Sequence, residues 1–591
     1  MRIPHIRSLA VAVTVTTAAT LPAAPALADA PAHASAAASS PVDAARAAAF
    51  AHASATGVSR GDTLQVKDVM TDPEGKQHVR FLRSHQGKLV LGGDLVIHLD
   101  RNARYLGVTR AARHTVTPVT ADAKLTAAQA RQKAASAAQG EAASAQLVVD
   151  ARDGHAALAY QVRVTRSRAE EAGGSRTVVV DALTGRIRSN SSDSDEFVSP
   201  SLANALRERG ESATPGTDGA AGLSGLTSAT ASPAGHYPVA ANGTGASLFV
   251  GKVPLITTQT GRTSYLLSDP TRWGTETRDA KGEELEAFSG GSKFTSSTDK
   301  WGNGATSNRA TVAVDAQYGI TQTLDFYKKT FGRKGIKNNS TGAHAMVHFG
   351  SKVGNAFWDS DCGCMLYGDG DNKVFKKPLV VLDVTGHELT HGVVDATAGL
   401  EPTRVDEDQN QYGEPGALNE SLADVFGSGV EFAANNPKNP PNYMIGEKLG
   451  LSQTFLRRLD HPSLDKLEGT VDYWSPAAYD TEVHAGSGIS SHAFYLLAEG
   501  SGKKTVGGVA YDSPTYDHSQ VAGIGRAKAL AVFYRALTRY MVSTTDFHDA
   551  RTATLQAAAD MYGAKSTEYR AVDKAWAAVD VTAANTPASG R

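Results

Sequence analysis

The hydrophobic pattern of the first third of the chain predicts strands. Between about residues 60 and 190, runs of β-branched and alternating residues are separated by turn residues, as in hairpins. The strand runs cover residues 89–100, 159–164 and 177–187, and a helical stretch covers 126–138. We therefore expect a hairpin-rich α+β unit over residues 29–190.

The pattern then changes character twice. Residues 191–240 are rich in Ser, Asp, Gly, Ala and Thr and have almost no large apolar side chains, which is typical of a flexible linker. Residues 241–394 mix short strand runs with turns, whereas residues 395–582 have mostly helical periods, and 583–591 form a tail. The predicted helices are 316–330 in the first lobe and 417–434, 488–499, 521–541, 547–562 and 566–579 in the second. A β-rich lobe before an α-helical lobe predicts an α+β fold with a cleft between them.

The N-terminus indicates export. Two arginines, Arg2 and Arg7, precede an apolar stretch, and Ala26-Leu27-Ala28 offers small residues before a cut, so residues 1–28 are predicted to be a signal peptide. The stretch is too short and too broken by prolines to be a membrane anchor, and no other apolar stretch reaches roughly 18 residues. We expect a secreted, extracellular protein with no membrane partner.

The unit over residues 29–190 is interpreted as a propeptide. A folded unit that follows a signal peptide and precedes a flexible linker is how a cleavable propeptide looks, so we place the maturation site within 191–240, by self-cleavage near residues 230–245. The alternative is an ordinary N-terminal domain that stays attached. The N-terminal sequence of the secreted protein distinguishes the two.

Charge and cysteine content exclude two classes of protein. The 59 Lys and Arg residues nearly balance the 61 Asp and Glu residues, and a nucleic-acid-coating protein would carry a basic excess, so we expect no nucleic-acid partner. The only two cysteines, Cys362 and Cys364, cannot form a disulfide framework. They form either a small loop clasp or two free thiols.

The candidate chemistry lies where the two lobes meet. Residues His387, Glu388 and His391 form the pattern H-E-x-x-H. On a helix the two histidines project from one face and reach one metal ion, while Glu388 reaches a metal-bound water without ligating. The alternative is a surface helix whose histidines are satisfied by other partners.

A second helical run supplies a third ligand. Catalytic zinc takes three protein ligands and keeps one open position. Glu420 in G-A-L-N-E-S-L-A-D completes a His₂Glu set, and Asp424, one turn later, can accept the free N–H of a ligating imidazole. The alternative for Glu420 is a first-turn glutamate favoured by the helix dipole.

These motifs carry a family resemblance. The runs V-T-G-H-E-L-T-H-G-V (384–393) and G-A-L-N-E-S-L-A-D (416–424) closely resemble the thermolysin-like neutral metalloproteases. Further matching segments, at 355–358, 367–371 and 483–489, follow in the order that the family has, over about residues 240–580. The resemblance implies a two-lobed zincin with zinc in the cleft, made as a secreted zymogen.

The resemblance also implies the roles of individual residues. His387, His391 and Glu420 would ligate zinc, Glu388 would be the general base, and His484 would donate to the oxyanion. The remaining implied roles are Asp480 as the acid that orients His484, Arg457 as the group that binds the substrate carbonyl beyond the scissile bond, and Asn355 and Ala356 as partners of an extended peptide.

Two regions depart from the family pattern. An acidic insertion at 403–411 displaces the tyrosine that assists the oxyanion, so either Tyr412 reaches in through a changed loop or His484 carries more of that role. Asp383, Glu431 and Glu447 match family calcium positions, and oxygen ligands suit that ion. Asn442 and Met444 stand where a paired calcium site would need acids, and Lys448 follows Glu447, so we expect at least one calcium ion rather than a paired site.

The sequence therefore predicts a secreted zinc-dependent endopeptidase that acts as a monomer on protein and peptide substrates. Its own propeptide would be an intramolecular inhibitor, and the resemblance implies a bulky hydrophobic residue after the scissile bond. Two alternatives are a catalytically inactive, zinc-stabilised binding protein of the same fold and a zinc hydrolase that acts on a non-peptide amide.

Overall fold

The computed structural model describes residues 40–112, 116, 122–165, 174–203, 237–285, 287–406 and 408–582. The predicted signal peptide, most of the predicted linker and the tail lie outside these residues. Every element below belongs to the unit Pro41–Arg591. Among the described residues, none of the helices has the length and apolar character needed to cross a membrane.

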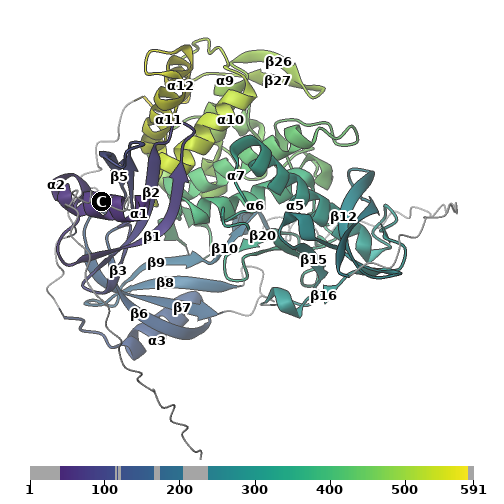
Figure 1. Cartoon of the computed structure of the whole chain (residues 1–591), viewed down its shortest axis with the longest axis horizontal. Coiled ribbons are helices and arrows are strands. Elements are labelled where there is room, and N and C mark those ends of the chain that lie inside the picture. Colours follow the sequence, from purple (N-terminus) through teal and green to yellow (C-terminus); the bar gives the residue numbers. More distant parts are fainter. Residues whose placement is uncertain are drawn as a thin grey trace, which may run out of the picture. The chain divides into compact units, whose positions relative to one another are not determined.

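The N-terminal part of this unit is built on one nine-stranded sheet (Figure 1), in the order β5-β4-β2-β3-β6-β7-β8-β9 with β1 beside β2. Its strands are β1 (Asp62–Thr71), β2 (Gln77–His85), β3 (Lys88–Leu91), β4 (Leu95–Leu99), β5 (Tyr105–Arg110), β6 (Glu141–Asp150), β7 (Ala157–Thr165), β8 (Ser175–Asp181) and β9 (Ile187–Ser192). Helices α1 (Pro41–Ala51), α2 (Ala53–Thr56) and α3 (Ala127–Ala138) accompany it. A capping box of Thr126 and Gln129 begins α3, whose buried alanines face the sheet because they recur every four residues.

The β-rich lobe that follows contains two sheets. A seven-stranded sheet has the order β10-β20-β21-β19-β15-β14 with β16 on β15, and a five-stranded sheet has the order β17-β13-β12-β11-β18. The strands of the first are β10 (Ser194–Glu196), β14 (Ser268–Asp269), β15 (Thr275–Asp279), β16 (Ser292–Lys293), β19 (His344–Val347), β20 (Ala356–Asp359) and β21 (Cys364–Tyr367). Those of the second are β11 (Val239–Ala246), β12 (Lys252–Gly261), β13 (Ser264–Leu266), β17 (Thr295–Ser296) and β18 (Lys300–Trp301). The long helix α5 (Arg309–Phe331) lies in the core of the lobe with most of its residues buried.

The prediction of a flexible linker over 191–240 is wrong for its first part. Residues 194–196 form strand β10, which pairs antiparallel with β20 as an edge strand of the catalytic sheet. Phe197 and Val198 follow it and are completely buried. The composition was misleading because an edge strand is held by main-chain hydrogen bonds, which do not require apolar side chains.

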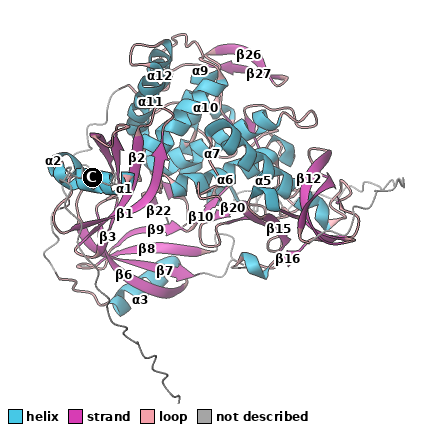
Figure 2. Cartoon of the chain, viewed as in Figure 1, coloured by secondary structure: helices cyan, strands magenta, loops and turns pink. Residues whose placement is uncertain are grey.

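Helices dominate the last part of the chain, as predicted (Figure 2). They are α6 (Leu382–Ala396), α7 (Glu414–Ala434), α8 (Val483–Gly486), α9 (Gly488–Ala498), α10 (Arg526–Arg535) with a π-helical turn at Ala536–Tyr540, α11 (Phe547–Tyr562) and α12 (Thr567–Ala577). The short hairpins β22–β23 (Arg404–Val405, Gln411–Tyr412), β24–β25 (Met444–Ile445, Arg457–Arg458) and β26–β27 (Gly502–Val506, Val509–Ser513) join them. The predicted α+β class, with a β-rich region before a helical one, is confirmed.

Helices α6 and α7 approach each other closely because glycines face one another at their contact. A Cβ atom on Gly427 would lie 2.7 Å from the Asp383 carbonyl oxygen and 3.0 Å from the His387 nitrogen. A Cβ atom on Gly386 would lie 2.9 Å from the Gly427 Cα atom. No larger residue fits there without separating the helices, so this contact places the acidic side chains of α7 beside the histidines of α6.

Cys362 and Cys364 form a disulfide just before and at the start of β21. Of the two alternatives left open by the sequence, the structure has the loop clasp rather than two free thiols. The bridge joins positions only two residues apart, so it constrains a single turn of the β20–β21 hairpin.

Candidate active site

Three side chains from α6 and α7 converge in the buried interior. The Nε2 atoms of His387 and His391 are 3.0 Å apart, since four residues on a helix bring both rings to one face. Glu420 Oε2 is 3.4 Å from His387 Nε2, and Glu420 Oε1 is 3.7 Å from His391 Nε2. One ligand atom from each residue lies within 4.8 Å of the others, so the group can hold a metal ion.

The other nitrogen of each ring is already held. His387 Nδ1 is 2.7 Å from Asp424 Oδ1, and His391 Nδ1 is 3.0 Å from Asn419 Oδ1. A carboxylate only accepts hydrogen bonds, so His387 donates from Nδ1 and directs Nε2 toward the other ligands. The sequence pattern identified Asp424 for this contact but not Asn419, which lies one residue before Glu420.

The three side chains shift one another's pKa values. Burial alone would lower the pKa of His387, but hydrogen bonds to Asp424 and Glu420 outweigh it and raise the pKa to about 9. Burial lowers the pKa of His391 to about 4. Although burial opposes ionisation of Glu420, the surrounding histidines lower its pKa below the usual value. A carboxylate and two imidazoles so arranged are a donor set that zinc prefers.

Glu388 lies next to this group and is completely buried. Burial raises its pKa to about 8, and the charges of Glu420 and Asp195 act in the same direction. A carboxylate in these surroundings is a stronger base than a solvated one, which suits a group that accepts and returns a proton near neutral pH.

His484 reaches the same place from α8. Its Nε2 atom is 2.7 Å from the carbonyl oxygen of Glu196, and also 3.6 Å from Glu420 Oε2. Its Nδ1 atom is 2.9 Å from Glu482 Oε1. Burial would lower the pKa of His484, but the nearby Glu482 and Glu420 carboxylates raise it well above its usual value, so Nε2 is a hydrogen-bond donor.

The prediction that Asp480 orients His484 is wrong. The Asp480 carboxylate is exposed and accepts a hydrogen bond from Arg404 at 2.8 Å, whereas Glu482 holds the histidine. Asp480 ends a 3₁₀ turn (Pro476–Asp480), and the chain then turns so that Glu482 caps α8 through the backbone N–H of His484. The capping role follows from the glutamate's place directly before a helix.

Residues 194–198 form an extended segment that begins with β10, beside β20 (Figure 1). The Phe197 N–H donates to the Ala356 carbonyl at 3.1 Å, and Arg457 Nη1 donates to the Phe197 carbonyl at 3.0 Å. The Val198 N–H donates to Asn355 Oδ1 at 3.1 Å. The three residues predicted to contact substrate therefore contact one and the same segment of this chain.

Arg457 is positioned by Asp424. Its Nε and Nη2 atoms donate to the two carboxylate oxygens of Asp424 at 2.8 and 2.9 Å. The same carboxylate orients His387, so one buried acid positions both a candidate metal ligand and the guanidinium. The neighbouring Arg458 instead pairs with Asp460.

Comparison with known protein families identifies both lobes. The model described as thermolysin metallopeptidase, catalytic domain, matches residues 242–395, and that of the thermolysin metallopeptidase alpha-helical domain matches 410–581. The fungalysin/thermolysin propeptide motif matches residues 62–112, and the peptidase propeptide and YPEB domain matches 124–190. The chain belongs to the thermolysin family of metallopeptidases.

Curated relatives agree with this membership. A transglutaminase-activating metalloprotease from Streptomyces mobaraensis is 37% identical over 535 residues, which is 89% of this chain and 62% of that protein. Thermolysin from Alicyclobacillus acidocaldarius is 34% identical over 365 residues, which is 59% of this chain and 60% of that protein. This chain thus spans about 60% of the length of these relatives. Among solved structures, the precursor of protealysin from Serratia proteamaculans matches 52% of this chain and 87% of its own at 27% identity, with a TM-score of 0.39.

Tyr412 does not reach the metal ligands with its hydroxyl. The hydroxyl donates to Asp406 at 2.7 Å, and the ring lies against the Arg404 guanidinium, both residues of the predicted insertion. Of the two alternatives drawn from the sequence, this geometry favours the one in which His484 carries more of the oxyanion contact.

A second group of acids lies between the same two helices. Asp383 of α6, Glu431 of α7 and Glu447 can together hold a metal ion. Burial raises the pKa of all three, that of Glu447 to about 8, and repulsion within the group adds to the shift of Glu431 and Glu447. Asn442, noted in the sequence for replacing an acid, donates to both Glu431 and Glu447. An all-oxygen set of this kind suits calcium.

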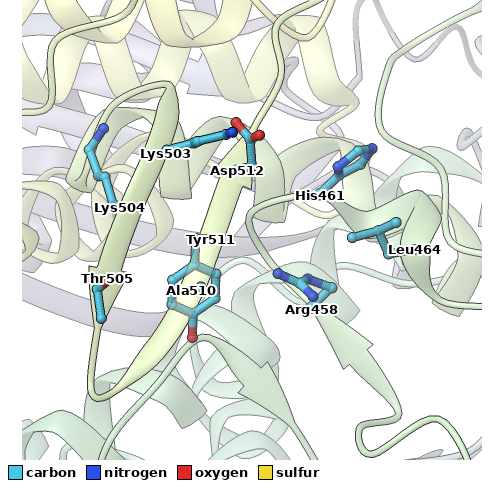
Figure 3. Close-up of a pocket in the computed structure, with 9 residues that line it drawn as sticks. All are labelled: Arg458, His461, Leu464, Lys503, Lys504, Thr505, Ala510, Tyr511 and Asp512. Carbon is cyan, nitrogen blue, oxygen red and sulfur yellow. The ribbon is translucent and has the colours of Figure 1, made fainter.

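An open surface pocket of about 480 Å³ lies elsewhere, beside the β26–β27 hairpin (Figure 3). Its lining comprises Arg458, His461, Leu464, Lys503, Lys504, Thr505, Ala510, Tyr511 and Asp512. None of the predicted site residues lines it. Figure 3 shows the Lys503 side chain extending toward Asp512, so the basic residues there are partly balanced by an acid.

Three contributors to the site were missed by the sequence analysis. Glu482 and Asn419 orient His484 and His391, and Phe197 fills the space beside His387, with the two ring centroids 5.3 Å apart. A signal existed for Phe197 and Val198, the only adjacent pair of large apolar residues in a stretch that is otherwise polar and small.

Proposed function

We propose that this chain is a secreted, zinc-dependent endopeptidase made as a zymogen, which hydrolyses internal peptide bonds. The observation that carries the proposal is the contact between the catalytic lobes and residues 194–198. A peptide lies in extended form against β20, with one of its carbonyls on His484, beside a buried His₂Glu group and a buried glutamate. This is the arrangement that peptide-bond hydrolysis requires.

His387, His391 and Glu420 would hold the zinc ion. Bound there, zinc lowers the pKa of a water molecule and polarises a carbonyl group. The other chemistry belongs to protein groups. Glu388 takes a proton from the attacking water and returns it to the departing amine nitrogen. His484 donates from Nε2 to the oxygen of the carbonyl under attack, where negative charge develops.

The substrate is held mainly through its backbone. Ala356 accepts from the N–H of the scissile bond itself, Arg457 donates to the next carbonyl, and Asn355 binds the following amide, as each does with residues 197 and 198. Strand addition of this kind gives affinity without regard to sequence. Specificity then comes from side-chain pockets, and the buried Phe197 ring supports a preference for a bulky hydrophobic residue after the scissile bond.

The propeptide would act as an intramolecular inhibitor. Besides residues 194–198, it contacts the helical lobe through Asp72, whose carboxylate accepts from Arg535 and Arg539. Asp94 accepts from Ser543. These buried contacts hold the propeptide at a second place, so it keeps the substrate-binding strand position occupied.

Secretion is supported by the signal-peptide pattern of residues 1–28. Proteins are the substrate class that we propose, which agrees with a relative named for activating transglutaminase.

The test replaces Glu388 by Gln. We expect Glu388→Gln to bind zinc and fold normally while peptidase activity on an internally quenched peptide falls by about 10³-fold or more, because the proton acceptor is lost. The matched control is Glu283→Gln, an exposed glutamate of the same lobe, which should retain full activity. Retained activity in Glu388→Gln would rule out this mechanism, and an inactive wild type that still binds zinc would favour the binding-protein alternative.

A further inference from the structure

The peptide bond between Glu196 and Phe197 occupies the position at which a substrate bond would be cut. Strand β10 reaches Glu196 in antiparallel register with β20, pairing Glu196 with Phe357 and Asp195 with Trp358. Phe197 continues this register, since its N–H donates to the Ala356 carbonyl, and the chain stays buried through Phe197 and Val198. The catalytic groups lie beside this end of the strand pairing.

The carbonyl side of the bond meets the oxyanion donor. His484 Nε2 is 2.7 Å from the Glu196 oxygen, which is the shortest contact of that histidine with the segment. His484 also lies 3.6 Å from the ligand Glu420, so the Glu196 carbonyl group is next to the metal ligands. A hydrogen bond at this oxygen is the one that strengthens when the carbonyl carbon becomes tetrahedral.

The amine side of the bond is fixed by three further contacts. The Phe197 N–H donates to the Ala356 carbonyl, its own carbonyl accepts from Arg457 at 3.0 Å, and Val198 is bound on both sides by Asn355. These contacts fix the polarity of the chain, but any residue offers the same backbone groups, so the register must be set by a side chain.

The side chain of Phe197 occupies a buried pocket. Its ring is completely buried, 5.3 Å from the His387 ring and 5.1 Å from the Arg457 guanidinium carbon. Val198 beside it is also completely buried, but Phe197 is the large aromatic residue of the segment and packs against His387 and Arg457, so we take it as the residue that selects this register.

We infer that Glu196–Phe197 is the first bond that the enzyme cuts, in its own chain. The inference rests on the proposed function. Water adds its oxygen to the Glu196 carbonyl carbon, the C–N bond breaks, and the Phe197 nitrogen takes a proton through Glu388. The products are a propeptide that ends in a new carboxylate at Glu196 and an enzyme chain that begins with a new amine at Phe197. Processing near residues 230–245 then removes the remaining stretch in a later step.

The contacts at Asp72 determine what happens to the propeptide after this cut. They lie on the propeptide side of the bond and hold Arg535 and Arg539 independently of residues 194–198. The cut propeptide therefore stays attached to the enzyme, and the new ends remain close together until the propeptide dissociates or is degraded.

The test uses the full-length precursor, purified in the presence of a chelator and then given zinc. The new N-termini are identified by mass spectrometry at successive times, at several dilutions. We expect Phe197 to be the first new N-terminus, paired with a fragment that ends at Glu196, at a rate that does not change with dilution. A first cut at 230–245 with Glu196–Phe197 intact, or a rate proportional to concentration, would overturn the inference.

Two substitutions test the register. Phe197→Asp should slow this cut by about 10-fold or more, because a charge is buried in the pocket, whereas Phe197→Leu should keep it. Phe50→Asp, which replaces a partly exposed phenylalanine of the propeptide, is the matched control and should cut at the wild-type rate. An unchanged rate in Phe197→Asp contradicts the inference. If that variant fails to fold, cleavage of a synthetic peptide spanning residues 192–202 decides, and cutting at another bond contradicts it.

The same samples separate this inference from the proposed function. Hydrolysis of an unrelated quenched peptide by the zinc-loaded protein, with Glu196–Phe197 left intact, overturns the inference alone. Hydrolysis of neither overturns both. The Glu388→Gln precursor should show no new N-terminus at Phe197, and its appearance there would mean that another protease makes the cut.

Discussion

Two buried groups of candidate metal ligands lie between the same pair of helices, and they differ in the kinds of donor atom that they offer. Helix α6 supplies His387 and His391 to one group and Asp383 to the other. Helix α7 supplies Glu420 to the first and Glu431, three turns later, to the second. The first group mixes nitrogen and oxygen donors, whereas the second has only carboxylates, completed by Glu447.

The surroundings of the two groups differ as well. Each histidine of the first group is held at Nδ1 by a second residue, and the group adjoins the peptide bound at His484. The second group is enclosed by local chain, with Asp383 accepting from the Gly446 N–H and Glu431 from the Asn442 N–H. An oriented, three-ligand set next to a substrate suits catalytic zinc, and an enclosed oxygen set suits structural calcium.

The two groups also differ in how their side chains shift one another's pKa values. In the first, the acids raise the pKa of His387 to about 9 against the effect of burial, and the histidines lower the pKa of Glu420, so opposite charges stabilise one another. In the second, burial raises the pKa of the acids themselves, and repulsion within the group adds to the shift of Glu431 and Glu447. A divalent cation therefore relieves repulsion in the second group, while in the first it is part of the chemistry.

The largest expected effect comes from Glu420→Gln. This change removes one zinc ligand charge from the first group, so we expect peptidase activity to fall by about 10³-fold, with bound zinc reduced and the thermal unfolding temperature little changed. Zinc content by atomic absorption, activity on a quenched peptide and thermal unfolding measure the three quantities. Full activity with normal zinc content would remove Glu420 from the ligand set.

The matched substitution on the same helix is Glu431→Gln. Here we expect activity at moderate temperature to remain within about 2-fold of wild type, while the thermal unfolding temperature in calcium falls by roughly 5 to 10 °C and no longer responds to calcium. Thermal unfolding with and without calcium gives the comparison. If Glu431→Gln unfolds like wild type and keeps its calcium response, the second group is not the calcium site.

The residues of the first group could be read from the sequence because they follow helical spacing, whereas Asp383, Glu431 and Glu447 were predicted only from the family resemblance. His387 and His391 are four residues apart, and Glu420 and Asp424 are one turn apart, so a helix alone brings each pair to one face. The close approach of α6 and α7 depends on Gly386 and Gly427, whose facing positions only the folded chain reveals.

The parts of the site that the sequence did not predict depend on loops and main-chain contacts. Asp480 and Glu482 are both acids shortly before His484, and the turn between them decides which one faces the histidine. Residues 194–198 bind through backbone groups, so their composition gave little indication of a strand. Sequence patterns therefore predicted the ligands and the fold class, and missed the positioning of the substrate-like segment.

The smallest expected effect comes from a substitution in the turn between Asp480 and Glu482. Glu482→Gln keeps a hydrogen-bond acceptor for His484 Nδ1 but removes the negative charge that supports the histidine as a donor, so we expect kcat to fall by about 10-fold with little change in KM. Asp480→Asn is the matched control and should leave both constants unchanged, since Asp480 pairs with Arg404 on the surface. A rise in KM alone would indicate that Glu482 acts only by capping α8, because a displaced helix would weaken peptide binding without a specific loss at the oxyanion. The opposite ranking of the two variants would return the orienting role to Asp480. Thermal unfolding of both variants separates loss of the cap from loss of charge, as only the former should lower stability.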